Sequence, residues 1–149
     1  MTELSSIHVD EFLPYPPDQV WLALTDPDKL AVWLMPNDFE LTVGHRFTFR
    51  TTPVPDSGFD GLVSCEVLEI DPQRLLRISW AGGATLRTTV TWRLVAEGRG
   101  TRVLLDHEGF DLSDPFQVVA HRGMSSGWRS NVLRRISALL DAQTSPRAE

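Results

Sequence analysis

Apolar and polar residues alternate with a period of two through the middle of the chain, and clusters of Gly, Pro and Asp interrupt the alternation at intervals. A period of two is typical of half-buried strands separated by turns. The pattern predicts six successive strands, at residues 39–43, 47–49, 63–67, 76–80, 86–94 and 103–107. A similar stretch at residues 7–13 predicts a further strand at the start, which makes seven.

Two short helices are predicted between the first strand and this series. Pro17 and Asp18 suit a first helical turn, because proline needs no N–H there and an acid meets the positive end of the helix dipole. The sequence at 25–27, Thr-Asp-Pro, breaks this helix and supplies an N-cap for a second one through Leu30 to Leu34.

A long helix is predicted near the C-terminus. Ser113 is a good N-cap, Asp114 and Pro115 fit the first turn, and no proline follows up to about Ala142. One stripe of this helix is apolar and consists of Trp128, Val132, Ile136, Leu139 and Leu140. At 1.5 Å per residue the helix would be about 40 Å long, enough to cover one face of the whole sheet. The other face, which is polar on every strand, would meet water.

Composition narrows the class of protein. The 149 residues, 42% of them hydrophobic, suffice for one core, so residues 1–149 are expected to form a single domain. A net charge of −6 without a segregated basic patch disfavours nucleic-acid and membrane-surface partners. Cys65 is the single cysteine, and neither a leader pattern nor a membrane-length apolar run is visible. A cytoplasmic location without membrane insertion is the expectation.

Four sequence words stand in order along nearly the whole chain: PPDQVWLALTDPDKLAVWL (16–34), DPQRLLRISW (71–80), GTRVLLDHEGF (100–110) and GMSSGW (123–128). Together with the element order they resemble the START-related, or SRPBCC, superfamily (birch-pollen-allergen-like). Within it they resemble the branch named for activators of the heat-shock-protein ATPase. The resemblance implies an α+β helix-grip fold, in which a seven-stranded, curved antiparallel sheet in the order β-α-α-β6-α wraps around the long C-terminal helix.

This fold hosts carriers, cyclases, resistance proteins and co-chaperone domains, so it does not by itself define a function. The co-chaperones that name the branch resemble this chain only in their C-terminal domain and carry a separate N-terminal domain that this sequence does not contain. A chaperone partner is therefore not expected.

His107 is the polar residue that the pattern singles out. It shares a strand face with Val103 and Leu105, so its imidazole is expected to point inward with them. Two interpretations stay open: a hydrogen-bonding anchor or general base for a small molecule, and a core histidine bonded to a neighbouring element. Thr88 and Met124 are its candidate neighbours in a cavity.

Tryptophans dominate the expected interior. Large rings with a few polar groups line many ligand pockets, although the same rings also serve simply as core. The candidate ligand-binding residues are Trp33, Phe49, Trp80, Thr88, Trp92, His107, Met124 and Trp128.

The remaining motifs are not expected to form a catalytic or metal-binding site. Residues 123–127 match the G-x-S-x-G pattern of a hydrolase nucleophile, but Ser125 is expected in a helix and no histidine follows it. Asp106 and Glu108 share the face opposite His107, where solvation is the expected role. The four histidines lack metal-ligand spacing, and no catalytic residue, metal or cofactor is assigned.

Three hypotheses follow. The first is binding of a small hydrophobic or aromatic molecule between the sheet and the C-terminal helix. The second is an enzyme of cyclase or hydrolase type that uses the same cavity, with His107 as acid or base. The third is a chaperone-interacting module that acts through an outer surface. The identity of the ligand stays open, as does whether a second copy of the chain is a partner.

Overall fold

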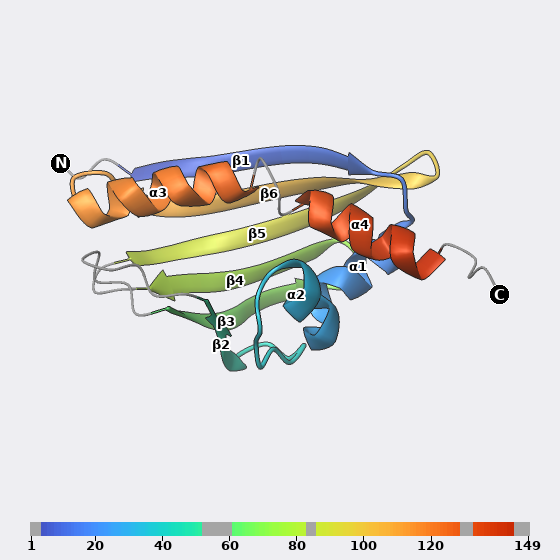
Figure 1. Cartoon of the computed structure of the whole chain (residues 1–149), viewed down its shortest axis with the longest axis horizontal. Helices are drawn as coiled ribbons and strands as arrows, with labels where there is room; N and C mark the ends of the chain where they lie inside the picture. Colours follow the sequence, from blue (N-terminus) through green and yellow to red (C-terminus); the bar gives the residue numbers. More distant parts are fainter. Residues whose placement is uncertain (1–3, 52–60, 83–85, 129–132, 145–149) are drawn as a thin grey trace.

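A computed structural model of the chain describes residues 4–51, 61–82, 86–128 and 133–144. In these ranges the chain forms one antiparallel sheet and four helices, and the helices gather over one face of the sheet (Figure 1). None of the described helices is long and apolar enough to cross a bilayer.

The sheet has the strand order β1-β6-β5-β4-β3-β2. Its strands are β1 (Leu4–Leu13), β2 (Arg46–Arg50), β3 (Leu62–Asp71), β4 (Leu75–Gly82), β5 (Leu86–Glu97) and β6 (Gly100–Asp111). Strands β2 to β6 form the predicted meander, and β1 pairs antiparallel with β6, so the first strand lies beside the last. Buried and less buried residues alternate along these strands, which leaves one face of the sheet for the core.

Four helices cover that face. They are α1 (Pro17–Thr25), α2 (Pro27–Trp33), α3 (Pro115–Gly127) and α4 (Leu133–Thr144). Helices α1, α2 and α4 pack together at one end of the sheet, whereas α3 lies along β6 and β1 (Figure 1). The two ends of the core are therefore covered by different elements.

The starts of α1 and α2 agree with the sequence. Pro17 is the first residue of α1, and the carboxylate of Asp26 accepts the backbone N–H of Asp28 at 2.9 Å, which caps α2. A side chain that accepts an otherwise unpaired N–H stabilises a helix start, typically by ~1 kcal/mol.

The sheet contains six strands in the described ranges, and the predicted strand at 39–43 is wrong. Phe39 is buried in the core, but Leu41 and Val43 are 40% and 59% exposed, so the alternation does not continue along a buried face. The carboxylate of Asp38 accepts the backbone N–H of Thr48 at 2.7 Å, which occupies an edge donor of β2. That hydrogen bond is also the main reason why the pKa of Asp38 is lowered. The side chain of Asp38 therefore takes up an edge N–H of β2 that a neighbouring strand would otherwise bond.

The single C-terminal helix predicted for residues 113–142 is not confirmed, because the described residues form two helices, α3 and α4. They run in different directions (Figure 1), and residues 129–132 lie outside the described ranges. Helix α3 also starts one residue later than expected: Asp114, not Ser113, is the N-cap and accepts the N–H of Phe116 at 3.0 Å.

The physical reason for two helices lies in what each end buries. Trp128, which follows α3, places its indole against the sheet, whereas Ile136 and Leu140 of α4 are buried in the core. Helix α4 contacts α1 and α2 rather than continuing along β6. Gly127 is the last residue of α3, and the N–H of Trp128 still bonds to the carbonyl oxygens of Met124 and Ser125.

A β-bulge near the end of β6 changes which residues face inward. Ser5 pairs with Phe110 and Ser6 with Glu108, so Gly109 is the extra residue on β6. Its φ of +100° lies in a region that glycine adopts without a Cβ penalty. Because of this extra residue, both His107 and Phe110 are buried on the same side of the sheet.

The outer face of the sheet carries ion pairs. Asp106 pairs with Arg93 at 2.9 Å and with His8, and Arg102 bridges Asp10 and Glu97. These groups are partly exposed, so each pair contributes little to stability. The position of Asp106 agrees with its predicted place on the wet face.

Candidate ligand-binding site

The inner face of the sheet surrounds His107 with apolar side chains. Val103, Leu105 and His107 are fully buried, as the alternation along this strand predicts. His107 pairs across the ladder with Val90 of β5 and with Ile7 of β1, so it lies near the middle of three strands.

A chain of hydrogen bonds joins His107 to β4, β5 and the residue after α3. The indole Nε1–H of Trp128 donates to Nδ1 of His107 at 3.1 Å. The imidazole Nε2 lies 2.7 Å from Oγ1 of Thr88, and this hydroxyl donates to the carbonyl oxygen of Trp80 at 2.7 Å. Three strands and the C-terminal segment are thus tied together by one buried network.

The network defines the protonation state of His107. Indole is a donor only, so Nδ1 must accept and carries no proton. Thr88 uses its own hydrogen on Trp80, so Nε2 carries the imidazole proton and donates it to Thr88. Burial, and secondarily the charge of His121, lowers the pKa of His107 to about 3. The imidazole is therefore neutral at neutral pH, with both nitrogens engaged by the protein.

A row of aromatic rings crosses the inner face beside this network. The ring of Trp80 lies 5.4 Å from Phe49 and 5.9 Å from Trp128 between centroids, and Trp128 lies 6.0 Å from Trp92. Phe47 extends the row on β2 at 5.3 Å from Phe49. Tilted and edge-to-face contacts at these distances are favourable for aromatic rings.

The indole N–H groups in the core fall into two kinds. Nε1–H of Trp33 donates to the carbonyl oxygen of Ala23 at 2.6 Å, and that of Trp128 donates to His107. By contrast, Nε1 of Trp80 and Nε1 of Trp92 are buried and have no hydrogen-bond acceptor among the described residues.

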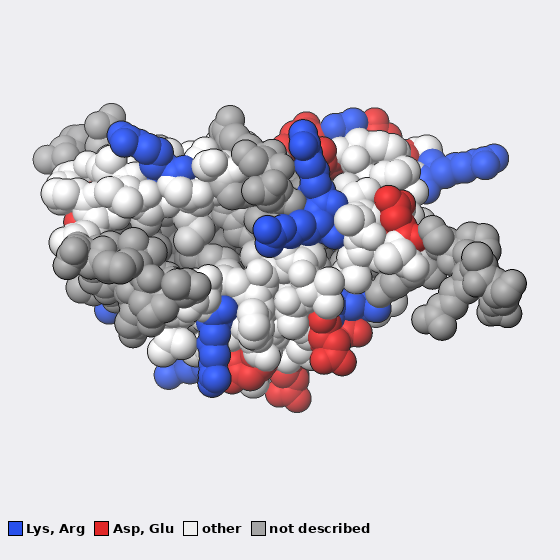
Figure 2. Space-filling view, in the orientation of Figure 1, with Lys and Arg blue, Asp and Glu red and all other residues white. Residues whose placement is uncertain are grey.

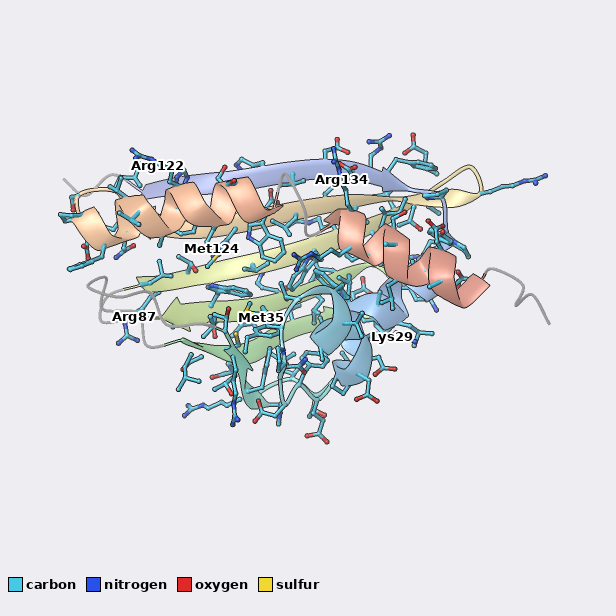
Figure 3. All side chains as sticks on the ribbon, viewed as in Figure 1. Lys29, Met35, Arg87, Arg122, Met124 and Arg134 are labelled. Carbon is cyan, nitrogen blue, oxygen red and sulfur yellow. The ribbon has the colours of Figure 1, made fainter. Side chains whose placement is uncertain are left out.

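The structure brings most of the predicted residues together. Hydrogen bonds and ring contacts connect six of them, namely Phe49, Trp80, Thr88, Trp92, His107 and Trp128. Met124 is partly buried against the same core and lies on the side of α3 that faces β5 (Figure 3). Trp33 is different: it is fully buried between α1 and α2, and its N–H is bonded to α1.

The sequence pattern did not predict two residues that lie near the site. Phe110 lies 4.6 Å from His107 between ring centroids and belongs to the site only because of the bulge at Gly109. A glycine that interrupts a strand pattern was the available signal. Met35 follows α2 and is partly buried against the core, and no periodicity marks it.

The inner face offers neither a charged group nor an activated nucleophile. The buried polar residues are Thr25, Thr88, Thr91, Thr101, His107 and Gln117, and none of the described Asp, Glu, Lys or Arg residues is buried. Burial raises the pKa of the Cys65 thiol above its usual range, so it is protonated at neutral pH. No three described His, Cys, Asp or Glu side chains form a group that could hold a metal ion.

The G-x-S-x-G match lies inside a helix. Ser125 is part of α3, so the strand-turn-helix geometry of a hydrolase nucleophile is missing there. A Cβ at Gly123 would meet no atom within 4 Å, so close approach of another group does not explain this glycine. The bend explanation fits Gly127, where α3 ends.

Three comparisons place the chain among known proteins. Residues 14–141 match the family model described as Activator of Hsp90 ATPase homolog 1-like protein. Protein MLL2253 from Mesorhizobium loti is 32% identical, with a TM-score of 0.82 over 95% of this chain and 100% of that one. No curated protein matches the sequence.

More distant structures share the fold. CalU16 from Micromonospora echinospora is 24% identical, with a TM-score of 0.71 over 98% of this chain and 86% of that one. DynU16, a protein in the dynemicin biosynthetic locus, is also 24% identical, with a TM-score of 0.73, and this chain covers 48% of its length. The chain therefore belongs to the family of Activator of Hsp90 ATPase homolog 1-like proteins, within the helix-grip SRPBCC superfamily.

Proposed function

We propose that this protein binds a small, largely apolar or aromatic molecule against the inner face of the sheet, next to α3. The observation that carries the proposal is the aromatic row of Phe47, Phe49, Trp80, Trp128 and Trp92. A lining of aromatic rings without buried charge favours a ligand of similar polarity.

The arrangement of the helices supports this location. Helix α3 packs on β6 and β1, while α1, α2 and α4 cover the opposite end of the sheet. Figure 2 shows the molecular surface hollowed on this face, below α3 and beside α4. A small molecule in this hollow would lie above β4 and β5, which carry Trp80 and Trp92.

Methionines near the hollow add to the argument. Met124 on α3 and Met35 after α2 are both partly buried against the core. In the view of Figure 3, Met124 lies above β4 and β5, and Met35 lies below them. A thioether chain is flexible and polarisable, so it adapts to the shape of an apolar ligand.

Catalysis by His107 is not favoured. A general acid or base needs a free nitrogen and a pKa near the working pH. Both nitrogens of His107 are engaged by Trp128 and Thr88, and its pKa is lowered to about 3. We therefore assign His107 to holding the site together.

The first test is a search for a bound molecule. Native mass spectrometry of the purified protein should reveal a co-purified small molecule or, after addition of fluorene or 9-fluorenone, a one-to-one complex. Titration with either compound should quench the intrinsic tryptophan fluorescence in a saturable manner.

A matched pair of variants on α3 locates the binding. Met124→Phe adds volume on the partly buried side of α3, whereas Val119→Phe adds it on the exposed side. We expect Met124→Phe to change the affinity about tenfold or more and Val119→Phe to leave it unchanged. Absence of saturable binding by both compounds, together with absence of a co-purified molecule, would refute the proposal.

A further inference from the structure

Two buried donors in the aromatic row have no acceptor from the described part of the chain. They are Nε1 of Trp80 and Nε1 of Trp92, whose side chains are 1% and 2% exposed. Both rings flank Trp128, at 5.9 Å and 6.0 Å between centroids. The two donors therefore belong to one small region next to the end of α3.

Such donors are unusual in a folded protein. A buried indole N–H normally finds a partner, because a donor removed from water without one is destabilising. The same core supplies acceptors to the indoles of Trp33 and Trp128, so this fold does pair other buried indoles. Two unpaired indoles that both contact Trp128 point to an acceptor that comes from outside the chain.

The surroundings limit the chemistry of that acceptor. None of the described acidic or basic residues is buried, and His107 is held neutral with both nitrogens in use. An anionic group placed among these rings would lose its hydration without meeting a counter-charge, which is costly. A neutral oxygen, by contrast, can accept an N–H without that cost.

We infer that the ligand carries a neutral hydrogen-bond-accepting oxygen, such as a ketone, quinone or lactone carbonyl, and that the indole N–H of Trp80, of Trp92 or of both binds it. This inference rests on the proposed function and specifies the ligand class. The two tryptophans thereby gain a role beyond packing, as the polar contacts that orient an otherwise apolar molecule.

Pairs of compounds that differ only in the acceptor test the inference. 9-Fluorenone and fluorene have nearly the same shape, and a carbonyl replaces a methylene; 1-indanone and indane form a smaller pair. We expect each ketone to bind about threefold to tenfold more tightly than its hydrocarbon, as one or two hydrogen bonds would provide. Fluorene-9-carboxylate should bind more weakly than 9-fluorenone at pH 7.

Variants then assign the donor. Trp80→Phe and Trp92→Phe each remove an unpaired N–H, and at least one of them should abolish the preference for 9-fluorenone over fluorene. Trp33→Phe, outside the candidate site, removes a paired N–H and should keep the preference while lowering the melting temperature. Where phenylalanine prevents folding, β-(3-benzothienyl)alanine at the same position keeps the bicyclic ring and lacks the N–H.

Nuclear magnetic resonance provides the direct readout. In protein labelled with ¹⁵N-tryptophan, the indole signal of Trp80 or Trp92 should move downfield with 9-fluorenone and not with fluorene, while that of Trp33 stays in place. If both compounds bind with equal affinity and shift the indole signals of Trp80 and Trp92 by the same amount, the inference is wrong although the proposed function stands. If neither compound of either pair binds and no small molecule co-purifies, the proposed function itself fails.

Discussion

The two ends of the core use the same residue type in different ways. Where α1, α2 and α4 meet, the buried N–H of Trp33 is bonded to the carbonyl oxygen of Ala23. Next to α3, Trp80 and Trp92 are as deeply buried but leave their donors unpaired. At the first end this indole is paired, whereas the second end leaves the indole donors of Trp80 and Trp92 unpaired, which costs some stability.

This difference follows a general relation between stability and function. Proteins tolerate local departures from complete polar pairing mainly where a ligand or a reaction requires them. The helices at the first end leave no polar atom of Trp33 unpaired, while α3 lies over β6 and β1 and leaves the region of β4 and β5 to a different partner. Stability and binding should therefore respond to different substitutions.

The largest expected effect is at the closed end. Trp33→Ala removes a fully buried ring and a 2.6 Å hydrogen bond, so we expect a loss of about 3–5 kcal/mol in the free energy of unfolding. Urea denaturation followed by circular dichroism measures it. The affinity for 9-fluorenone, determined where the variant is folded, should change little. A parallel loss of affinity would show that the two ends are not separable.

A smaller effect is expected at Trp128, whose paired indole contacts the unpaired indoles of Trp80 and Trp92. Trp128→Phe leaves Nδ1 of His107 buried without its donor, which should cost about 1–3 kcal/mol in the free energy of unfolding. Trp92→Phe is the matched control, because it makes the same change in size but removes an N–H that has no acceptor. Equal losses in the two variants would contradict the distinction between paired and unpaired donors.

The third expected effect is a dependence of stability on pH, which is small just below pH 6.5 and accumulates as the pH falls. The pKa of His107 is about 3 in the folded protein and near 6.5 in an unfolded chain, so between these values the unfolded state binds one more proton. Stability from this group is complete above about pH 6.5 and declines as the pH falls, by at most ~1.4 kcal/mol per pH unit. Urea denaturation at pH 7, 5.5 and 4.5 measures the slope.

His107→Gln is the control for this dependence. The glutamine amide can accept a hydrogen bond from Trp128 and donate one to Thr88, and it does not titrate in this range. We expect the variant to lose stability less steeply than the wild type as the pH falls. Identical slopes would mean that His107 takes up a proton in the folded state at an ordinary pH.

Some errors of the sequence-based predictions have a common cause. The alternation at Leu41 and Val43 is local information, and it cannot reveal that these two side chains are exposed to solvent in the folded protein. In the same way, the absence of proline from 113 to 142 indicates helical residues but not a change of direction between α3 and α4. The inward position of Phe110 depends on a pairing with Ser5, about a hundred residues away.

The sequence by itself determined the meander from Arg46 to Asp111, the short helices with the cap at Asp26, and the burial of Trp80, His107 and Trp128, because periodicity and capping are properties of neighbouring residues. Only the tertiary structure decided which indoles are paired. A hydrogen bond such as that from Trp128 to His107 depends on distance and direction between segments far apart in the chain, and residue spacing carries no record of either.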